Sequence, residues 1–410
     1  MNQTRLKKYA KLAVYTGVHL AEGQTLIIQA DIDTASFTRM IVEEAYEAGA
    51  REVLVYYRDP YLEKHNYHYQ SNEVLSEVHD WQLERHLDYL RKGAATLSVI
   101  SPRAGVLKDC DPQKMAIRQK AFSEASKEIR EYTMASKIQW SIVAVPNEEW
   151  AKLVFPNKDE KEAIECLWDA ILNCVYVEEN NDPLEVWNQR EELFQSRIEK
   201  LNQFNFKQLH FQNNLGTDLY VGLIKNHIWG GGSETAQNKI RFNANLPTEE
   251  VFTAPDFRNV NGIVYASRPL LYNGNLIKDF HMTFEAGKVI EYDAKEGKAV
   301  LKEMLEMDEG SASLGEVALV PYDSAISQSK LLFYTTLFDE NASCHLALGN
   351  AYPSTVKDGL MKSEEELKAL GFNISLIHVD FMFGSADMKV MGETQNGDWV
   401  SVFENGSFVI

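Results

Sequence analysis

Residues 25–57 read TLIIQADIDTASFTRMIVEEAYEAGAREVLVYY, and the architecture predicted for the first half of the chain follows from this stretch. It opens with TLIIQAD and closes with EVLVYY, two short apolar runs typical of buried β-strands. Between them, apolar residues recur at helical spacing and a glycine follows as a stop signal: Phe37, Met40, Ile41, Ala45, Ala48 and Gly49. This order of strand, helix and strand predicts parallel strands with a helix packed on the sheet.

The same alternation continues beyond this stretch. TLSVI at 96–100 and SIVAV at 141–145 are further strand candidates, and helical stretches such as MAIRQKAFSEASKEIREYTMAS separate them. The sequence therefore predicts an N-terminal α/β domain over residues 1–185, with a mostly parallel sheet covered by helices. No GxGxxG motif follows the first strand, so nothing supports the nucleotide-binding version of this architecture.

A long amphipathic helix begins at Asp182 and marks the predicted domain boundary. Its sequence, DPLEVWNQREELFQSRIEKLNQF, places a proline in the first turn and an apolar face along its length. The segments that follow, including TDLYVGL, GIVYASRPL and KDFHMTFEAGKVIEY, are β-rich, and Gly287 and Gly406 lie in sequences typical of hairpin turns. The sequence predicts a C-terminal α+β domain over 186–410, mixed and β-rich, which carries the metal site described below.

Composition excludes several classes of partner. The chain has 410 residues and a formal net charge of -19, from 60 acidic and 41 basic residues. Nucleic acid and anionic membranes both require a basic footprint, so neither is expected as a main partner. No apolar run approaches membrane-spanning length, and the N-terminus is predicted to be an amphipathic helix rather than a signal peptide. Four cysteines without a CxxC pair indicate reduced thiols, and we expect a cytoplasmic protein.

Acidic and histidine residues in the C-terminal part carry the chemistry: Glu250, Glu316, Glu340, His345, His378 and Asp380. Carboxylates and imidazoles are ligands of borderline-to-hard divalent metals, and the thiolates of a structural zinc site are missing. This set is too large for one catalytic ion, but it suits two metals roughly 3.5–4 Å apart that share an activated water. The sequence therefore predicts a dinuclear metallohydrolase.

His378 and Asp380 are one residue apart in the apolar run SLIHVDFMFG. In a β-strand both side chains would point to one face while their neighbours pack on the other. A charged aspartate is costly to bury unless it is paired or bound to a metal. The alternative to metal ligation is a buried hydrogen-bonded His–Asp pair, and His345, taken alone, also fits an ordinary partly buried histidine.

The other candidates have ordinary alternatives as well. Glu250 follows Glu249, and strand alternation directs their side chains oppositely, so we expect at most one of them to bind a metal. Gly315 permits close approach of the backbone beside a bridging Glu316, but a glutamate at a strand start is often solvent-facing. Tyr352 can stabilise an oxyanion near a metal pair, or it can simply pack in a loop before proline.

Four segments in order resemble the successive signature blocks of the aminopeptidase T/aminopeptidase S family, peptidase family M29: NLPTEEVFTAP, GEVALVPYDSAIS, FDENASCHLALGNAYP and IHVDFMFGS. The resemblance extends over nearly the whole chain. It implies a homodimeric aminopeptidase with two metal ions in the C-terminal domain and active sites that face an enclosed interior. It also implies metal ligands at Glu250, Glu316, His345, His378 and Asp380, a ligand or supporting acid at Glu340, and a catalytic tyrosine at Tyr352.

We therefore expect a metal-dependent aminopeptidase that acts on peptides with a free amino terminus. Glu316 is the first candidate for the base that takes the proton of the activated water. Two divalent ions per subunit are expected, and zinc, cobalt and manganese all suit the ligands. Two alternatives stay open: another metal-dependent amidohydrolase or esterase with different pocket walls, and a metal-stabilised binding protein without catalysis.

Overall fold

The computed structural model describes residues 2–103, 105–272 and 275–410. The chain forms two compact units, Met1–Asn188 with Ser233–Pro247 and Gln189–Gly232 with Thr248–Ile410. It passes from one unit to the other inside helix α10 (Pro183–Phe204). The two-domain division at 185 and 186 stays a prediction. No helix within the described ranges combines the length and the apolar composition that crossing a bilayer requires.

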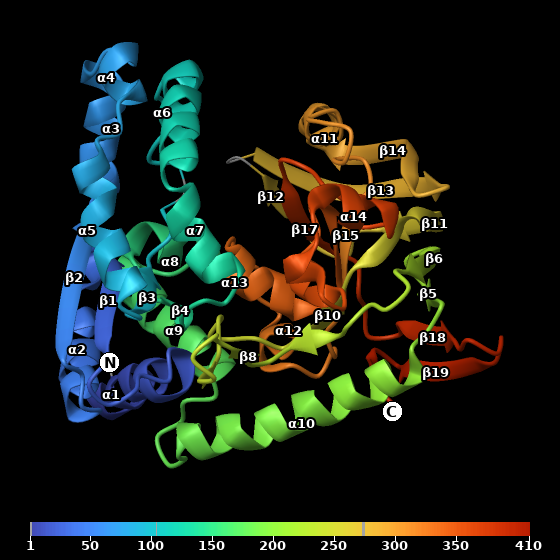
Figure 1. Cartoon of the computed structure of the whole chain (residues 1–410), viewed down its shortest axis with the longest axis horizontal. Helices are drawn as coiled ribbons and strands as arrows, with labels where there is room; N and C mark the ends of the chain where they lie inside the picture. Colours follow the sequence, from blue (N-terminus) through green and yellow to red (C-terminus); the bar gives the residue numbers. More distant parts are fainter. Residues whose placement is uncertain (1, 104, 273–274) are drawn as a thin grey trace. The chain divides into compact units, whose positions relative to one another are not determined.

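A four-stranded parallel sheet in the order β2-β1-β3-β4 forms the centre of the first unit (Figure 1). Its strands are the predicted apolar runs: β1 (Thr25–Asp31), β2 (Glu52–Arg58), β3 (Ala95–Ile100) and β4 (Trp140–Ala144). The central strand β1 pairs with both β2 and β3, and its residues Leu26, Ile27 and Ile28 are fully buried. Burial on both faces explains why such strands read as continuous apolar runs.

Helices predicted at the N-terminus and after β1 are present as α1 (Gln3–Leu12) and α2 (Ala35–Glu47). The ring of Phe37 in α2 lies 5.1 Å from Tyr9 of α1 and 5.7 Å from Trp168, which fixes these helices by aromatic packing. The remaining elements of this unit are α3 (Pro60–Tyr69), α4 (Asn72–Ser76), α5 (Asp80–Arg91), α6 (Pro112–Ala125), α7 (Lys127–Met134), α8 (Glu148–Val154), α9 (Glu160–Cys174), β8 (Glu234–Thr235) and β9 (Arg241–Phe242).

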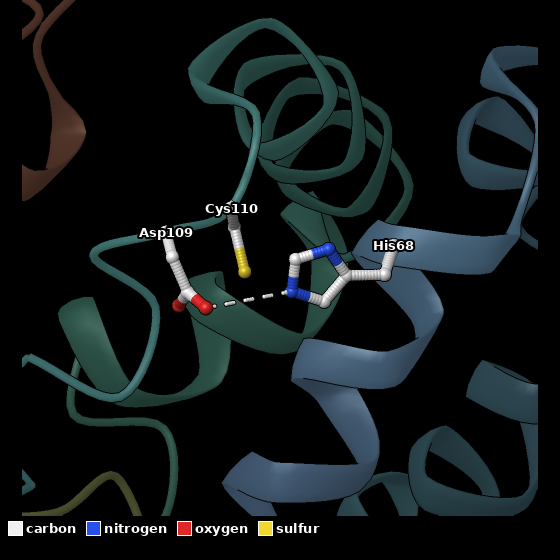
Figure 2. A group of neighbouring side chains, drawn as sticks. All are labelled: His68, Asp109 and Cys110. Atoms are coloured by element: carbon white, nitrogen blue, oxygen red, sulfur yellow. Dashed lines mark ion pairs between the residues drawn. The ribbon is translucent and has the colours of Figure 1, made fainter.

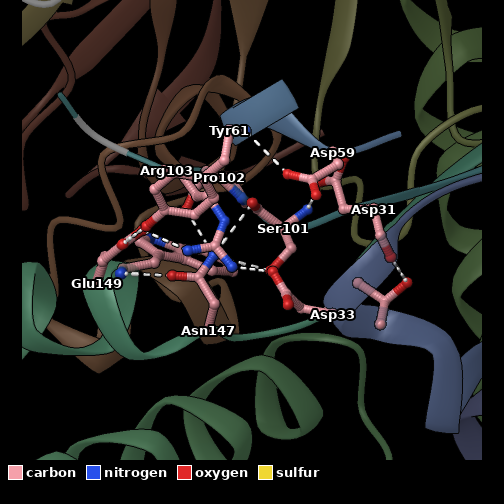
Figure 3. Close-up of polar contacts among 11 residues, drawn as sticks. Asp31, Asp33, Asp59, Tyr61, Ser101, Pro102, Arg103, Asn147 and Glu149 are labelled. Carbon is pink, nitrogen blue, oxygen red and sulfur yellow. Dashed lines mark hydrogen bonds and ion pairs between the residues drawn. The ribbon is translucent and has the colours of Figure 1, made fainter. Parts of the chain in front are cut away.

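Charged side chains gather at the carboxyl ends of β1 and β3 (Figure 3). Asp31 accepts the backbone N–H of Ser101 at 2.8 Å, and Arg103 lies 2.5 Å from Glu149 and 5.3 Å from the ring centre of Tyr61. Nucleotide-binding folds of this class place a glycine-rich loop and a phosphate at this position. Here the connection after β1 is the short turn Ile32–Thr34, and the charges neutralise one another.

Antiparallel sheets dominate the second unit, which confirms the predicted β-rich half. One sheet has the order β17-β16-β15-β10-β7, and the other has the order β12-β13-β11-β6-β5-β18-β19-β20 with β14 paired to β13. The predicted turns at Gly287 and Gly406 connect β13 to β14 and β19 to β20. Both glycines have a positive φ, 80° and 74°, which a hairpin turn requires.

The strands of this unit are β5 (Gln208–Gln212), β6 (Asp218–Leu223), β7 (Gly230–Gly231), β10 (Val251–Thr253), β11 (Pro255–Tyr265), β12 (Leu270–Tyr272), β13 (Asn275–Glu285), β14 (Lys288–Glu296), β15 (Leu314–Leu319), β16 (His345–Gly349), β17 (His378–Met382), β18 (Lys389–Glu393), β19 (Trp399–Glu404) and β20 (Ser407–Phe408). Its helices are α11 (Lys298–Leu305), α12 (Ala325–Ser329), α13 (Thr336–Asp339) and α14 (Glu364–Ala369).

The five-stranded sheet has one face in the hydrophobic core. Val317 and Leu319 of β15, Leu346 and Leu348 of β16, and Phe381 of β17 are all buried in the same apolar cluster. Burial of side chains of this size contributes about 1.5–3 kcal/mol each, so the register of these strands is strongly fixed. Because strand residues alternate between faces, the intervening positions project to the opposite side, where the candidate site lies.

Candidate metal centre

Three adjacent strands carry most of the predicted ligands on the face opposite the core. In the pairing register, Glu316 of β15 faces Ala347 of β16, and Ala347 faces Asp380 of β17. His345 and His378 lie two residues away from Ala347 and Asp380 on their strands. The two-residue period therefore places both imidazoles and both carboxylates on one face.

Small residues make room for these side chains on the same face. His345 pairs with Ala318 of β15, and His378 pairs with Gly349 of β16. Gly349 has a φ of 102°, and a β-carbon there would lie 2.1 Å from the backbone oxygen of Ile377. The glycine is thus required by the backbone itself, and it leaves open the space beside His378.

Glu316 contributes to two groups of potential metal ligands. The first group is Glu250, Glu316 and His345, and the second is Glu316, His378 and Asp380. The His345 Nε2 atom lies 3.0 Å from Glu250 Oε2 and 3.3 Å from Glu316 Oε1. The His378 Nε2 atom lies 3.8 Å from Glu316 Oε2 and 3.3 Å from Asp380 Oδ1. Each oxygen of Glu316 therefore faces a different histidine.

Both imidazoles are held by backbone carbonyls through the other ring nitrogen. His378 Nδ1 lies 2.7 Å from the carbonyl oxygen of Asn350, and His345 Nδ1 lies 3.4 Å from that of Ser343. A donor N–H at Nδ1 leaves the Nε2 lone pair free for a metal. This tautomer is the one in which a histidine acts as a neutral ligand.

Burial and crowded charges shift the protonation of the site. Burial raises the pKa of Glu316, with repulsion from Glu250 adding to it, although His345 acts in the opposite direction. Burial lowers the pKa of His378, but the attraction of Asp380 outweighs it and raises the pKa to about 10. For Asp380 burial is outweighed by His378, and its pKa falls below the usual range. Shifts of this kind cluster at functional sites.

The donor set fits divalent cations. Four carboxylates, from Glu250, Glu316, Glu340 and Asp380, face two imidazoles, so the deprotonated site carries excess negative charge in a buried place. The Asp380 Oδ1 atom is buried and makes no hydrogen bond, because His378 Nε2, although 3.3 Å away, is outside hydrogen-bond geometry. A buried, unsatisfied carboxylate oxygen is what metal coordination would stabilise.

The remaining candidates lie around these two groups. Glu340 belongs to neither group, but burial followed by repulsion from Glu250 and Asp380 raises its pKa well above the usual range. Tyr352 has its ring centre 4.8 Å from that of His378, and burial together with the carboxylates raises its pKa. Its phenol therefore keeps its proton at neutral pH.

Glu249 and Glu250 have different partners, although both precede β10, which begins at Val251, so strand alternation does not set their directions. Glu249 lies 2.5 Å from Arg190 Nη2, whereas Glu250 lies beside His345. The backbone N–H of Glu249 donates to Asn341 Oδ1 at 2.7 Å, and Asn341 Nδ2 is 3.3 Å from Glu340 Oε1. Sequence reasoning missed Asn341, which is fully buried between the two acidic segments. The only signal in the sequence is its place directly after Glu340.

A third group of metal-binding residue types lies in the first unit (Figure 2). His68 Nε2 is 3.9 Å from Asp109 Oδ2, and Cys110 is buried beside them. Lys64 Nζ already neutralises Asp109 at 2.7 Å, and burial raises the pKa of the Cys110 thiol. This group is therefore less suited to a cation than the carboxylate-rich centre.

Proteins of known class resemble this chain along its whole length. The family model for thermophilic metalloproteases (M29) matches residues 2–408. Aminopeptidase AmpS of Bacillus subtilis (strain 168) is 42% identical over 404 residues, which cover 98% of each chain. Aminopeptidase T of Thermus aquaticus is 38% identical over 99% of this chain and 98% of its own. The solved structure of wild-type AmpT from Thermus thermophilus has a TM-score of 0.93 at 37% identity and covers 99% of both chains.

Proposed function

Because the chain belongs to the M29 family of metalloproteases and is a metalloaminopeptidase, we propose that it removes N-terminal residues from peptides with a water activated between two divalent ions. The observation that carries the two-metal proposal is the position of Glu316, which takes part in both ligand groups. A carboxylate shared in this way is the natural bridge of a dinuclear site.

The two groups divide the ligands between the ions. Glu250, Glu316 and His345 would hold one ion, and Glu316, His378 and Asp380 would hold the other. When bound, the ions supply Lewis acidity that lowers the pKa of a water and polarises a peptide carbonyl. Zinc, cobalt and manganese all accept this mixture of oxygen and nitrogen ligands.

The protein's own side chains then position the reacting groups. Glu316, whose carboxylate lies between the two histidines, is our first candidate either for the shared ligand of the two ions or for the base that takes the proton of the activated water. Tyr352, protonated beside His378, donates a hydrogen bond to the oxygen that becomes negative during attack on the peptide. The carboxylates of Glu340 and Asp380 attract the cationic amino terminus, which confines cleavage to the first residue.

All of these residues lie within the unit formed by Gln189–Gly232 and Thr248–Ile410. Their location supports our proposal of an N-terminal domain over 1–185 and a catalytic domain over 186–410. We further propose a homodimer, on the basis of the family resemblance, and a cytoplasmic location, on the basis of the free cysteines. Light scattering of the purified protein tests the homodimer, and a single-subunit mass at working concentration would contradict it.

Hydrolysis of leucyl and aromatic aminoacyl chromogenic amides tests the function. We expect turnover that a chelator abolishes and that zinc, cobalt or manganese restores. Glu316→Gln should remain inactive after metal addition, whereas Glu285→Gln, an exchange at an exposed strand end, should remain active. Absence of turnover in the metal-loaded protein, on these amides and on longer free peptides, would reject the aminopeptidase proposal.

Blocked substrates separate an aminopeptidase from another amidohydrolase or esterase. An N-acetylated leucyl amide lacks the cationic amine that Glu340 and Asp380 are proposed to attract. We expect it to be a poor substrate, and equal turnover of free and acetylated amides would favour the alternative class. A metal-stabilised binding protein would instead show a change in stability on metal removal without turnover of either substrate.

A further inference from the structure

A small cavity opens onto the candidate metal centre from the side of Glu340 and Asp380. Its volume is about 100 Å³, and both of these carboxylates are among its lining residues. The other four candidate ligands do not line it. The cavity therefore adjoins the part of the site where we place the amino terminus of the substrate.

The walls of this cavity are mainly apolar. The apolar lining side chains include Leu270, Leu271, Leu276, Leu332, Tyr334 and Met382. They come from β12, β13, β17 and the segment 330–335 between α12 and α13. An apolar wall beside charged carboxylates is the usual composition of a pocket that binds one end of a ligand through charge and the other by burial.

Hydrogen bonds hold the segment 330–335, which forms one wall of the cavity. Arg268 Nη1 donates to the carbonyl oxygen of Leu331 at 2.7 Å. The Asp339 carboxylate accepts the backbone N–H groups of Phe333 at 2.8 Å and of Thr335 at 3.0 Å. Tyr334, between them, has a φ of 57°, a strained conformation that persists only where the surroundings fix it. The wall is thus preformed.

Asp339 lines the cavity, but its two oxygens are already used by the backbone. A basic side chain entering the cavity could bind Asp339 only by breaking these hydrogen bonds, and the proposed function assigns the other two lining carboxylates, Glu340 and Asp380, to the amino terminus of the substrate. An acidic side chain would be repelled by the Asp380 carboxylate, which also lines the cavity. These two facts leave apolar side chains as the class that the cavity suits.

We propose that this cavity receives the side chain of the first residue of the peptide and favours leucine and methionine. This inference rests on the proposed function. The volume corresponds to roughly three water molecules at about 30 Å³ each, close to an aliphatic side chain of four heavy atoms and smaller than an indole. In a hydrophobic pocket one methylene changes kcat/KM by roughly 10–200-fold, so leucyl substrates should exceed alanyl substrates by at least about tenfold.

The test is the ratio of kcat/KM for leucyl to alanyl amides in the metal-loaded enzyme. Leu332→Trp and Leu276→Trp fill the cavity from two different segments of its lining, and each should lower this ratio at least about tenfold. Leu215→Trp, at an exposed turn of the same unit, is the matched control and should keep the ratio of the parent enzyme. Thermal unfolding of each variant establishes that the ratio is measured on folded protein.

The outcomes separate the pocket from the proposed function. Active, folded variants that keep the parental ratio would overturn the pocket and leave the aminopeptidase in place. A parent enzyme that prefers arginyl or glutamyl amides to leucyl amides would also overturn it. Absence of chelator-sensitive turnover of every aminoacyl amide would instead reject the proposed function, and the pocket with it.

Discussion

Glu316 illustrates how much of the chemistry is decided at single positions. It is only 4% exposed, and it lies between two histidines that face different oxygens of its carboxylate. In isolation a buried carboxylate in this position would be protonated or would destabilise the fold. Its presence is therefore best explained by the cations that the family requires.

Tyr352→Phe tests the role of the phenol. We expect kcat to fall by roughly 10²–10³-fold, because the variant loses one hydrogen bond to the developing oxyanion. Metal content and KM should change little, since the ring of Tyr352 still packs against Phe252 and His378. The measurements are steady-state kinetics and elemental analysis, with the exposed Tyr69→Phe as control. Unchanged kcat would remove Tyr352 from the mechanism.

Asn341→Ala tests a positioning residue that contacts no substrate. The backbone N–H of Glu249 would lose its partner, which costs about 1–3 kcal/mol of unfolding free energy. Displacement of Glu250 and Glu340 should also weaken metal binding by roughly 10–100-fold. Denaturant unfolding and competition with a metal-binding dye measure the two effects. Asn214→Ala, on an exposed turn, should change neither, and wild-type metal affinity in Asn341→Ala would contradict the positioning role.

Prediction from sequence succeeds at this scale where spacing carries the information. His378 and Asp380 could be predicted to share a face, because alternation in a strand is a local property. The carbonyl of Asn350, which orients His378, could not be predicted, because every residue has a carbonyl and only the fold selects one. Asn341 was missed for a similar reason, since its contacts depend on the path of a remote segment.

At the scale of elements, the position of β17 depends on a hydrogen-bonded clamp, which Asp308 forms with residues 375–376 just before the strand. The Asp308 carboxylate accepts the backbone N–H of Leu376 at 2.5 Å and the hydroxyl of Ser375 at 2.8 Å. It also accepts the N–H groups of Gly310 and Ser311, at 2.8 and 2.9 Å. Asp308 thus ties the segment that leads into β17 to the turn after α11, two residues before His378.

Asp308→Asn tests this clamp through pH. Burial opposes ionisation of Asp308, but the hydrogen bonds from Leu376 and Ser375 outweigh it, and its pKa falls below the usual value of 3.8. A lowered pKa stabilises the folded state above pH 4 and loses this effect as the pH falls through the folded-state pKa. We expect the variant to be less stable by about 1–2 kcal/mol at pH 7, a modest loss because solvent reaches the carboxylate.

Urea unfolding at several pH values measures this difference. The stability gap between the parent protein and Asp308→Asn should shrink below pH 4 and vanish in stronger acid. Asp279→Asn, whose carboxylate is exposed and lies 3.5 Å from Lys295, is the matched control and should show little change. A gap that is independent of pH would show that the Asp308 charge does not hold the segment.

Helix and strand types follow from local patterns, but irregularities do not. The predicted helical stretch at 115–136 is interrupted at Ser126, where the hydroxyl donates to the carbonyl of Phe122 at 2.6 Å. Such a bond competes with the helix ladder and bends it. The register shift between Leu314 and Glu316 depends similarly on contacts across strands, since a β-carbon on Gly315 would lie 2.3 Å from the Gly349 oxygen.

At the scale of the whole molecule, metal binding and stability are coupled. The chain carries a formal charge of -19, and the centre concentrates several carboxylates in a buried place. Ligands that bind only the folded state stabilise it by about 4 kcal/mol at a thousand times Kd. We therefore expect a chelator to lower the Tm by on the order of 10 °C.

Calorimetry with and without a chelator, at constant ionic strength, measures this shift. Glu316→Gln should show a much smaller difference between the two conditions, because it lacks the shared carboxylate. The same Tm in metal-loaded and chelated parent protein would mean that the centre does not hold ions tightly. Re-addition of the metal should restore the higher Tm and the activity together.

The succession of a parallel sheet and antiparallel sheets along the chain was predictable at this scale. The exact division of the residues between the two compact units was not. Alternating strands and helices, then β-rich segments, predict a parallel sheet followed by antiparallel ones, as observed. The return of Ser233–Pro247 to the first unit has no local signature, because these residues are short strands and turns like those around them.

The return of Ser233–Pro247 to the first unit determines when this unit can complete its folding during synthesis. The backbone N–H of Asn243 donates to the carbonyl oxygen of Gly17 at 2.9 Å. In β4, the N–H of Ile142 donates to the carbonyl oxygen of Ala244 at 2.9 Å, and its carbonyl oxygen accepts the N–H of Leu246 at 3.1 Å. A ribosome that adds roughly 5–20 residues per second needs about 3–12 s to travel from residue 188 to residue 247. Until then the nascent first unit lacks these partners, so its maturation waits for a stretch that is translated after the other unit has already begun.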